Sequence, residues 1–144
     1  MLYKYIMSDW TYDGKLVDLE TVDKYHGFVY VIENEITGKK YIGKKKFKFT
    51  RAKKLKGQRK IRVSKESDWR SYFGSCKELV ADVQALGPEN FKRTILRFCK
   101  SPGENTYWEM WHQMTNHVLL HPADWYNNYV GGRIQRSHVL KKEK

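Results

Sequence analysis

The sequence has little cysteine, no long apolar run and no acidic residue in its most basic segment. Cys76 and Cys99 form no Cys-x-x-Cys pair, which argues against a disulfide framework and a cysteine-based zinc site. The longest apolar run, Phe28 to Ile32, has five residues, too few for a membrane span. The first ten residues lack the basic and apolar regions of a signal peptide. We expect an intracellular, cytoplasmic protein with no membrane partner.

The composition excludes a disordered chain. Hydrophobic residues make up 40% of the 144 residues, and these include 6 Phe, 5 Trp and 10 Tyr. Disordered chains contain far fewer aromatic residues. A chain of this length can bury one core and has little room for a second, so we expect a single domain.

The positive charge is concentrated in one segment. The chain has 28 Lys and Arg against 16 Asp and Glu, for a net charge of +12. The 27 residues from Lys39 to Lys65 hold 14 of the cations and no acid, so the rest of the chain has a balance of −2. Such a field favours nucleic acid, because binding releases condensed counterions. The alternative is a charge run that serves only solubility.

The hydropathy pattern predicts an α/β (α+β) fold. Residues 27–34 read as a buried strand, 34–38 as a turn and 39–44 as a second strand, which together predict a β-hairpin. Residues 91–99 predict a third strand. We expect a small antiparallel sheet of about three strands flanked by helices.

Helices are predicted on either side of the third strand. One begins at Ser75 and ends before Gly87, and the other runs from about Glu104 to Leu120. In the basic segment we expect a short helix over 47–56 and an exposed loop over 57–65.

The hairpin resembles the GIY-YIG nuclease family. FVYVIEN stands at the first motif of the family, with Tyr30 as its tyrosine, and KYIGK contains the second motif, which begins at Tyr41. The two tyrosines are eleven residues apart, as the family hairpin requires. Arg51 follows Tyr41 by ten residues, the offset at which the family has an arginine on its first helix.

Later segments extend the resemblance over Gly27 to Arg133. WEMWHQM resembles the segment with the metal-binding glutamate of the family, here Glu109, and WYNN resembles its late Tyr-Asn element, here Asn127. SDWRSYFGSCKEL and GPENFKRTIL resemble the phage-associated branch, which is related to homing endonucleases. Each motif alone is common, so the order and spacing carry the resemblance.

The resemblance implies a Mg²⁺-dependent DNA endonuclease in which Mn²⁺ could replace Mg²⁺, located in the host cytoplasm if phage-encoded. Its implied site comprises a base or nucleophile positioner, two supports for it, a ligand of the scissile phosphate, a metal ligand and a brace of the phosphate region. In that order these are Tyr30, Tyr41 with Lys40, Arg51, Glu109 and Asn127. The alternative function is a catalytically inactive nucleic-acid-binding module that uses the basic segment 39–65.

The residue types also suit phosphodiester hydrolysis. Cations beside a tyrosine favour its phenolate, so we expect the neighbouring lysines to lower the pKa of Tyr30 and Tyr41. An arginine matches two phosphate oxygens, and a lone carboxylate suits Mg²⁺, which keeps most of its waters. The hairpin lysines in question are Lys39, Lys40, Lys44 and Lys45.

Two assignments have alternatives, and one family residue is missing from this chain. Arg62 or Arg70 replaces Arg51 if the basic segment shifts the register, and Glu104 replaces Glu109 if the metal lies at the start of the helix. Many family members carry a histidine one helical turn after the arginine, where this chain has Leu55. By resemblance to members with a lysine just before the second tyrosine, Lys40 would then take over part of the histidine's role in proton transfer.

The resemblance also implies a domain organisation. We expect an N-terminal extension over 1–26, a nuclease domain over 27–133 with a basic insertion at about 44–65, and a polar tail over 134–144. The chain leaves no room for a separate DNA-reading module, so the insertion, the termini or a homodimer would supply specificity. We expect the insertion to become ordered only on DNA, because its middle lacks apolar residues. Its predicted DNA contacts are Lys44, Lys45, Lys46, Lys48, Lys53, Lys54, Lys56, Arg59, Lys60 and Arg62.

Overall fold

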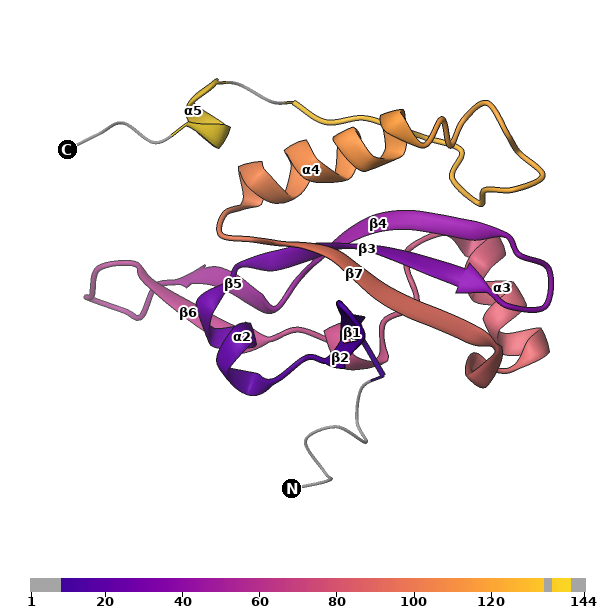
Figure 1. Ribbon diagram of the computed structural model, residues 1–144. Helices are drawn as coiled ribbons and strands as arrows, with labels where there is room; N and C mark the ends of the chain where they lie inside the picture. Colours follow the sequence, from indigo (N-terminus) through magenta and orange to yellow (C-terminus); the bar gives the residue numbers. More distant parts are fainter. Residues whose placement is uncertain (1–8, 134–135, 141–144) are drawn as a thin grey trace.

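The computed structural model describes residues 9–133 and 136–140. Its centre is a mixed sheet of five strands in the order β2-β1-β7-β3-β4 (Figure 1). These strands are β1 (Thr11–Tyr12), β2 (Lys15–Leu16), β3 (Gly27–Asn34), β4 (Lys40–Lys46) and β7 (Phe91–Cys99). The prediction of about three antiparallel strands was therefore too small, because two short strands near the N-terminus extend the sheet and β1 runs parallel to β7.

The predicted hairpin, β3 with β4, forms one edge of this sheet. Strands β3 and β4 pair antiparallel over seven residue pairs, with Tyr30 opposite Gly43. Gly38 closes the turn with a φ of +80°, a conformation that favours glycine. The predicted third strand is β7, and it lies on the other side of β3.

Helices cover both faces of the sheet. Helix α4 (Pro102–Thr115) lies across one face (Figure 1), where Trp108 packs near Val29 and Ile42. Helix α3 (Lys77–Leu86) contributes Leu79 and Val83 to the larger core on the opposite face. The remaining helical elements are α2 (Leu19–Lys24), η1 (Trp69–Ser71), η2 (Pro88–Asn90) and α5 (Arg136–Val139).

The two predicted helices differ from α3 and α4 at their ends. Helix α3 has Cys76, not Ser75, as its N-cap and ends where Gly87 takes a φ of +94°. Helix α4 begins at the N-cap Ser101 and stops at Thr115, five residues before the predicted end. Within residues 9–133 and 136–140 no helix has the length and hydropathy of a transmembrane span.

The N-terminal residues from Asp9 onward belong to the core of the domain. Trp10 is fully buried, and its indole nitrogen donates a hydrogen bond to the carbonyl oxygen of Trp69 at 2.7 Å. Part of the expected N-terminal extension thus packs on the domain, its boundary at residue 27 stays a prediction, and residues 1–8 lie outside the described part. Of the predicted polar tail, α5 is described, and residues 134–135 and 141–144 are not.

The basic insertion forms a two-stranded ribbon of β5 (Lys48–Lys53) and β6 (Ile61–Glu66), which we call the basic ribbon. The predicted helix over 47–56 and loop over 57–65 are therefore wrong. Both strands alternate in side-chain character and contain β-branched residues, and Gly57 turns the chain with a φ of +78°. The expectation that this segment becomes ordered only on DNA stays a prediction, because the two strands pair with each other but bury no side chain.

Candidate active site

Two tyrosines converge over a glycine on β4. Tyr30 lies opposite Gly43 in the sheet and is only 1% exposed. A Cβ at position 43 would overlap the Tyr30 hydroxyl, and it would lie 2.7 Å from Cζ of Tyr30 and 2.8 Å from Cε1 of Tyr41. The ring centroids of the two tyrosines are 6.2 Å apart. The glycine of the second motif therefore leaves the space in which the two rings meet.

A third tyrosine, Tyr72, completes this cluster. Its ring stands perpendicular to that of Tyr30, with 6.2 Å between centroids, and the two side chains share a hydrogen bond. Nζ of Lys45 lies 4.0 Å from the Tyr72 centroid. Our sequence analysis missed Tyr72, whose only local signal was the Tyr-x-Gly pattern that it shares with the second motif.

The tyrosines are held in their neutral form. Burial raises the pKa of Tyr30 well above its usual value, with further increases from Tyr72, Tyr41 and the negative charge of Glu109. Burial also raises the pKa of Tyr41, although its hydroxyl contact with Ser75, at 3.4 Å, lowers the pKa in part. The expected lowering by lysines was therefore wrong.

Two hairpin lysines, Lys39 and Lys45, are paired with acids. Nζ of Lys39 lies 2.7 Å from a carboxylate oxygen of Glu78, and Nζ of Lys45 lies 2.6 Å from one of Asp68. Each ion pair reduces the positive field that reaches the tyrosines. Burial of the phenol groups is then the dominant influence.

Lys40 lies away from the tyrosine cluster. Alternation along β4 places its side chain on the face of Ile42, opposite that of Tyr41. Its Nζ lies 4.0 Å from a carboxylate oxygen of Glu33. This placement disagrees with the predicted role of Lys40 as a direct support of Tyr30.

Asn127 braces the outer edge of β4. Its Oδ1 accepts a hydrogen bond from the Ile42 N–H at 3.0 Å, and its Nδ2 donates to the Ile42 carbonyl at 2.8 Å. Two backbone hydrogen bonds at Lys40, with Asp124 and Tyr126, hold the same segment beside the strand. Because Asn127 is itself buried, its amide fixes the strand that carries the second motif.

Side chains of helix α4 contact further backbone groups along the edge strand β4. Asn105, Glu109 and Gln113 recur every four residues and so form one stripe of the helix. Gln113 donates to the Ile42 carbonyl at 3.0 Å, and the Glu109 carboxylate accepts from the backbone N–H of Lys44. Glu109 is thereby held beside the glycine that the tyrosines approach.

Glu109 has the properties of a metal ligand. Burial raises the pKa of its carboxyl group, although Lys44 opposes this increase. In the described part of the chain it forms no ion pair within 4.0 Å, and no cluster of three or more His, Cys, Asp or Glu residues could enclose a metal there. A single carboxylate fits Mg²⁺, which retains several waters and uses one or two protein carboxylates with the substrate phosphate.

Glu104, the alternative metal ligand, serves as a helix cap. Its carboxylate accepts a hydrogen bond from the Lys100 N–H at 2.8 Å, while its own N–H donates to Oγ of Ser101 at 3.1 Å. This arrangement is a variant of the capping box, in which the carboxylate accepts from the residue before the N-cap. The geometry therefore favours Glu109 over Glu104.

The three candidate arginines have different surroundings. Arg51 is exposed on β5, on a strand and not on the helix that the resemblance implied. Arg62 lies opposite Ala52 and so projects from the other face of the ribbon. Nε of Arg70 is 2.7 Å from a carboxylate oxygen of Glu66. Arg51 thus shares the ribbon face of Phe49, which borders the site.

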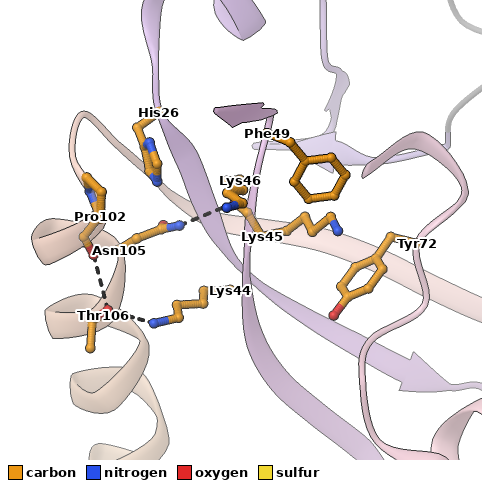
Figure 2. Close-up of a pocket in the computed structure, with 9 residues that line it drawn as sticks. All are labelled: His26, Lys44, Lys45, Lys46, Phe49, Tyr72, Pro102, Asn105 and Thr106. Carbon is orange, nitrogen blue, oxygen red and sulfur yellow. Dashed lines mark hydrogen bonds between the residues drawn. The ribbon is translucent and has the colours of Figure 1, made fainter. Parts of the chain in front are cut away.

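A basic hollow of about 360 Å³ lies between β4, the ribbon and the first turn of α4 (Figure 2). The side chains of Lys44, Lys45 and Lys46 line it, and Nζ of Lys44 donates to Oγ1 of Thr106 at 2.6 Å. His26 also lines the hollow, where burial and the charges of Lys46 and Lys44 lower its pKa. Sequence analysis did not assign His26 to the site.

The other predicted DNA contacts follow the basic ribbon outward. Lys48 lies at its base, where Nζ is 3.2 Å from a carboxylate oxygen of Asp23. The remaining cations on the ribbon and its connecting turn are all exposed: Lys53, Lys54, Lys56, Arg59, Lys60 and Arg62. The predicted basic surface therefore continues from the hollow to the end of the ribbon.

Comparison with known proteins gives one family match and one curated relative. The sequence profile described as "Putative endonuclease segE, GIY-YIG domain" matches residues 10–130. "Putative endonuclease segE" of Enterobacteria phage T4 is 30% identical over 123 residues, which cover 83% of this chain and 50% of that protein. The chain thus spans about half the length of this relative. No solved structure matches the present chain significantly.

Proposed function

Because the chain belongs to the GIY-YIG family, in the segE type, we propose that it is a metal-dependent endonuclease that hydrolyses phosphodiester bonds in DNA. The observation that carries this proposal is the convergence of Tyr30 and Tyr41 at Gly43, with Tyr72 against Tyr30 and the Glu109 carboxylate at the neighbouring Lys44 backbone. Basic side chains border the same place, so a phosphate can approach without an unfavourable field.

Tyr30 positions the attacking water in this proposal. Its hydroxyl is protonated at neutral pH, because burial raises its pKa. A neutral phenol can accept a hydrogen bond from water while its own proton is directed to Tyr72. Of the two predicted roles, base or positioner, these surroundings support the positioner. Tyr41 packs beside it and keeps the water on one side of the phosphate.

Glu109 is the proposed ligand of a divalent ion, with Mg²⁺ as the first choice and Mn²⁺ as a substitute. When bound, such an ion would neutralise charge on the pentacovalent phosphorus and stabilise the departing 3′ oxygen. The hydrogen bond from the Lys44 N–H orients the carboxylate. Gln113 and Asn127 hold β4 against α4 and thereby fix the distance between this carboxylate and the tyrosines.

The substrate phosphates are assigned to the basic side chains. Lys44, Lys45 and Lys46 line the hollow beside Tyr72 and would hold the phosphate next to the cleaved bond. Arg51 would reach the scissile phosphate from the ribbon, where its guanidinium can form two hydrogen bonds with phosphate oxygens. The other ribbon cations would anchor the DNA backbone on either side.

A non-catalytic DNA-binding module is the second candidate. One observation favours it: the expected helix with the catalytic arginine is replaced by a strand. Binding cannot separate the two candidates, because both predict salt-sensitive association. A plasmid-nicking assay with Mg²⁺, Mn²⁺ or EDTA separates them. Metal-dependent conversion of supercoiled to nicked or linear DNA supports the endonuclease, and intact plasmid over a wide range of salt contradicts it.

A further inference from the structure

The basic ribbon projects from the domain with its base fixed. Phe47, which precedes β5, is fully buried, and its carbonyl accepts a hydrogen bond from the Ser67 N–H at 2.8 Å. All six residues of β5 and all six of β6 are exposed, and the two strands form a sheet of their own (Figure 1). A two-stranded hairpin without a core is marginally stable in water. Such an element is suited to a binding partner.

The two faces of this ribbon differ in composition. Residues that pair across the strands lie on the same face, and successive residues alternate between faces. One face, which we call the mixed face, interleaves cations with apolar side chains: Phe49, Arg51, Lys53, Ile61, Val63 and Lys65. The other, which we call the polar face, carries Lys48, Thr50, Ala52, Arg62, Ser64 and Glu66.

The apolar residues of the mixed face are exposed. Phe49 is 44% exposed, Ile61 is 49% exposed and Val63 is 39% exposed. A ribbon that only neutralised phosphates would need cations and would gain nothing from three exposed apolar side chains. On the polar face, by contrast, Lys48 and Glu66 are engaged in ion pairs with the domain.

The mixed face is continuous with the catalytic site. Phe49 lines the same hollow as Tyr72, and Nζ of Lys45 lies 5.1 Å from the Phe49 ring centroid (Figure 2). Arg51 follows Phe49 on this face. DNA with a phosphate at the tyrosine cluster would therefore meet the mixed face next.

We propose that the basic ribbon enters the major groove beside the cleaved phosphate and reads base edges with its mixed face. The major groove is about 12 Å wide and admits a two-stranded β-ribbon, whereas the minor groove, about 6 Å wide, admits one only where the DNA is deformed. Six residues of strand span roughly 20 Å, enough to cross the groove. Ile61 and Val63 would contact thymine methyl groups, and Lys53 guanine acceptors. The proposal rests on the endonuclease function and gives the catalytic domain its own sequence-reading element.

Sequencing of the DNA ends released from a plasmid with a random-sequence insert tests whether the ribbon reads bases next to the cut. Wild-type protein is expected to prefer particular bases next to the cut. The double variant Ile61→Ser with Val63→Ser should weaken this preference about tenfold, with an unchanged salt dependence because no charge is removed. The polar-face control, Thr50→Ala with Ser64→Ala, should keep the preference. An equal preference in all three proteins, or none in the wild type, would overturn the proposal while leaving DNA cleavage intact.

Methylation protection gives an independent measurement that needs no cleavage and no ribbon variant. Dimethyl sulfate attacks guanine N7 in the major groove and adenine N3 in the minor groove. On DNA that contains the preferred cut site and is bound by the Glu109→Gln protein, we expect protection of guanine N7 on one side of the cut. If the wild-type protein cleaves no DNA, we expect the same protection on whichever sequence the protein binds. Protection of N3 alone, or of neither atom, would contradict insertion into the major groove. If the wild-type protein cleaves no DNA but guanine N7 is still protected, the endonuclease proposal is rejected and the proposal of ribbon insertion stands.

Discussion

The hydroxyl of Tyr30 occupies the space that a Cβ of residue 43 would need, so the tyrosine of the first motif and Gly43 of the second depend on each other. They face each other across the β3–β4 pair, which fixes the approach. The glycine acts here through its missing side chain, because the backbone of Gly43 does not have a positive φ. The spacing of the two motifs follows from this register.

Gly43→Ala should displace both tyrosine rings. Overpacking of a buried site costs roughly 1–3 kcal/mol, so we expect a lower free energy of unfolding in urea together with a loss of cleavage. Gly38→Ala is the control, since Gly38 has a φ of +80° and nothing near its Cβ position. It should cost roughly 1 kcal/mol of strain and leave cleavage by the folded protein unchanged. Full activity of Gly43→Ala would contradict the proposed arrangement.

Glu109→Gln and Glu104→Gln should separate metal binding from capping. We expect the first to abolish the Mn²⁺ signal bound to the protein–DNA complex, as measured by electron paramagnetic resonance, because it removes the one proposed protein ligand. The second should retain the bound ion and lower the free energy of unfolding by roughly 0.3–1 kcal/mol, because glutamine keeps an acceptor for the Lys100 N–H and loses only the negative charge near the helix N-terminus. The reverse pattern would transfer the metal to Glu104.

Without metal, Glu109→Gln should stabilise the protein at neutral pH. Burial raises the carboxyl pKa of Glu109 in the folded state, so the charged form opposes folding. Below the unfolded pKa both states are protonated and the penalty is absent. As pH rises through the folded pKa, the penalty becomes complete. Thermal unfolding in EDTA should therefore show an advantage of the variant at pH 7.5 that disappears near pH 4, and a destabilised variant at pH 7.5 would contradict the assigned burial.

Arg51→Ala should lower the rate of cleavage at saturating DNA far more than Arg62→Ala. Both remove one charge from the ribbon, but only Arg51 lies on the face that borders the site. Loss of a group that stabilises the transition state lowers the rate about 100-fold or more, whereas loss of a phosphate anchor changes affinity and reduces the salt slope by about one unit. Equal effects in single-turnover kinetics would place Arg51 among the anchors.

The hairpin and its two tyrosines could be predicted because strand periodicity, the turn glycine and the motif spacing are all local features of the sequence. The placement of Glu109 on a helix was predictable for a similar reason, since that helix is marked by Ser101 and Pro102 at its start. The direction of the tyrosine pKa shifts was not. It depends on burial by Trp10 and Tyr72, which lie far from the hairpin in the sequence.

The ribbon and the N-terminal strands were missed for different physical reasons. Lysines and arginines dominate residues 48–66 and obscured an alternation that only the cross-strand pairing reveals. The strand β1 has two residues and pairs with β7, about eighty positions further along, and such a short strand has no periodicity of its own. Its place is determined by the burial of Trp10.

Single-turnover cleavage by Tyr30→Phe, with wild-type protein as reference, tests whether the Tyr30 hydroxyl positions the attacking water. The variant keeps the ring that packs against Trp10 and removes only the hydroxyl that faces Gly43. At saturating DNA and Mg²⁺ we expect the rate to fall at least about 100-fold, on the scale of a lost oxyanion-hole donor, with unchanged DNA affinity. The wild-type rate should vary little between pH 7 and 9, because the raised pKa keeps the hydroxyl protonated. A wild-type rate that rises tenfold per pH unit, or full activity of Tyr30→Phe, would contradict the neutral positioning role.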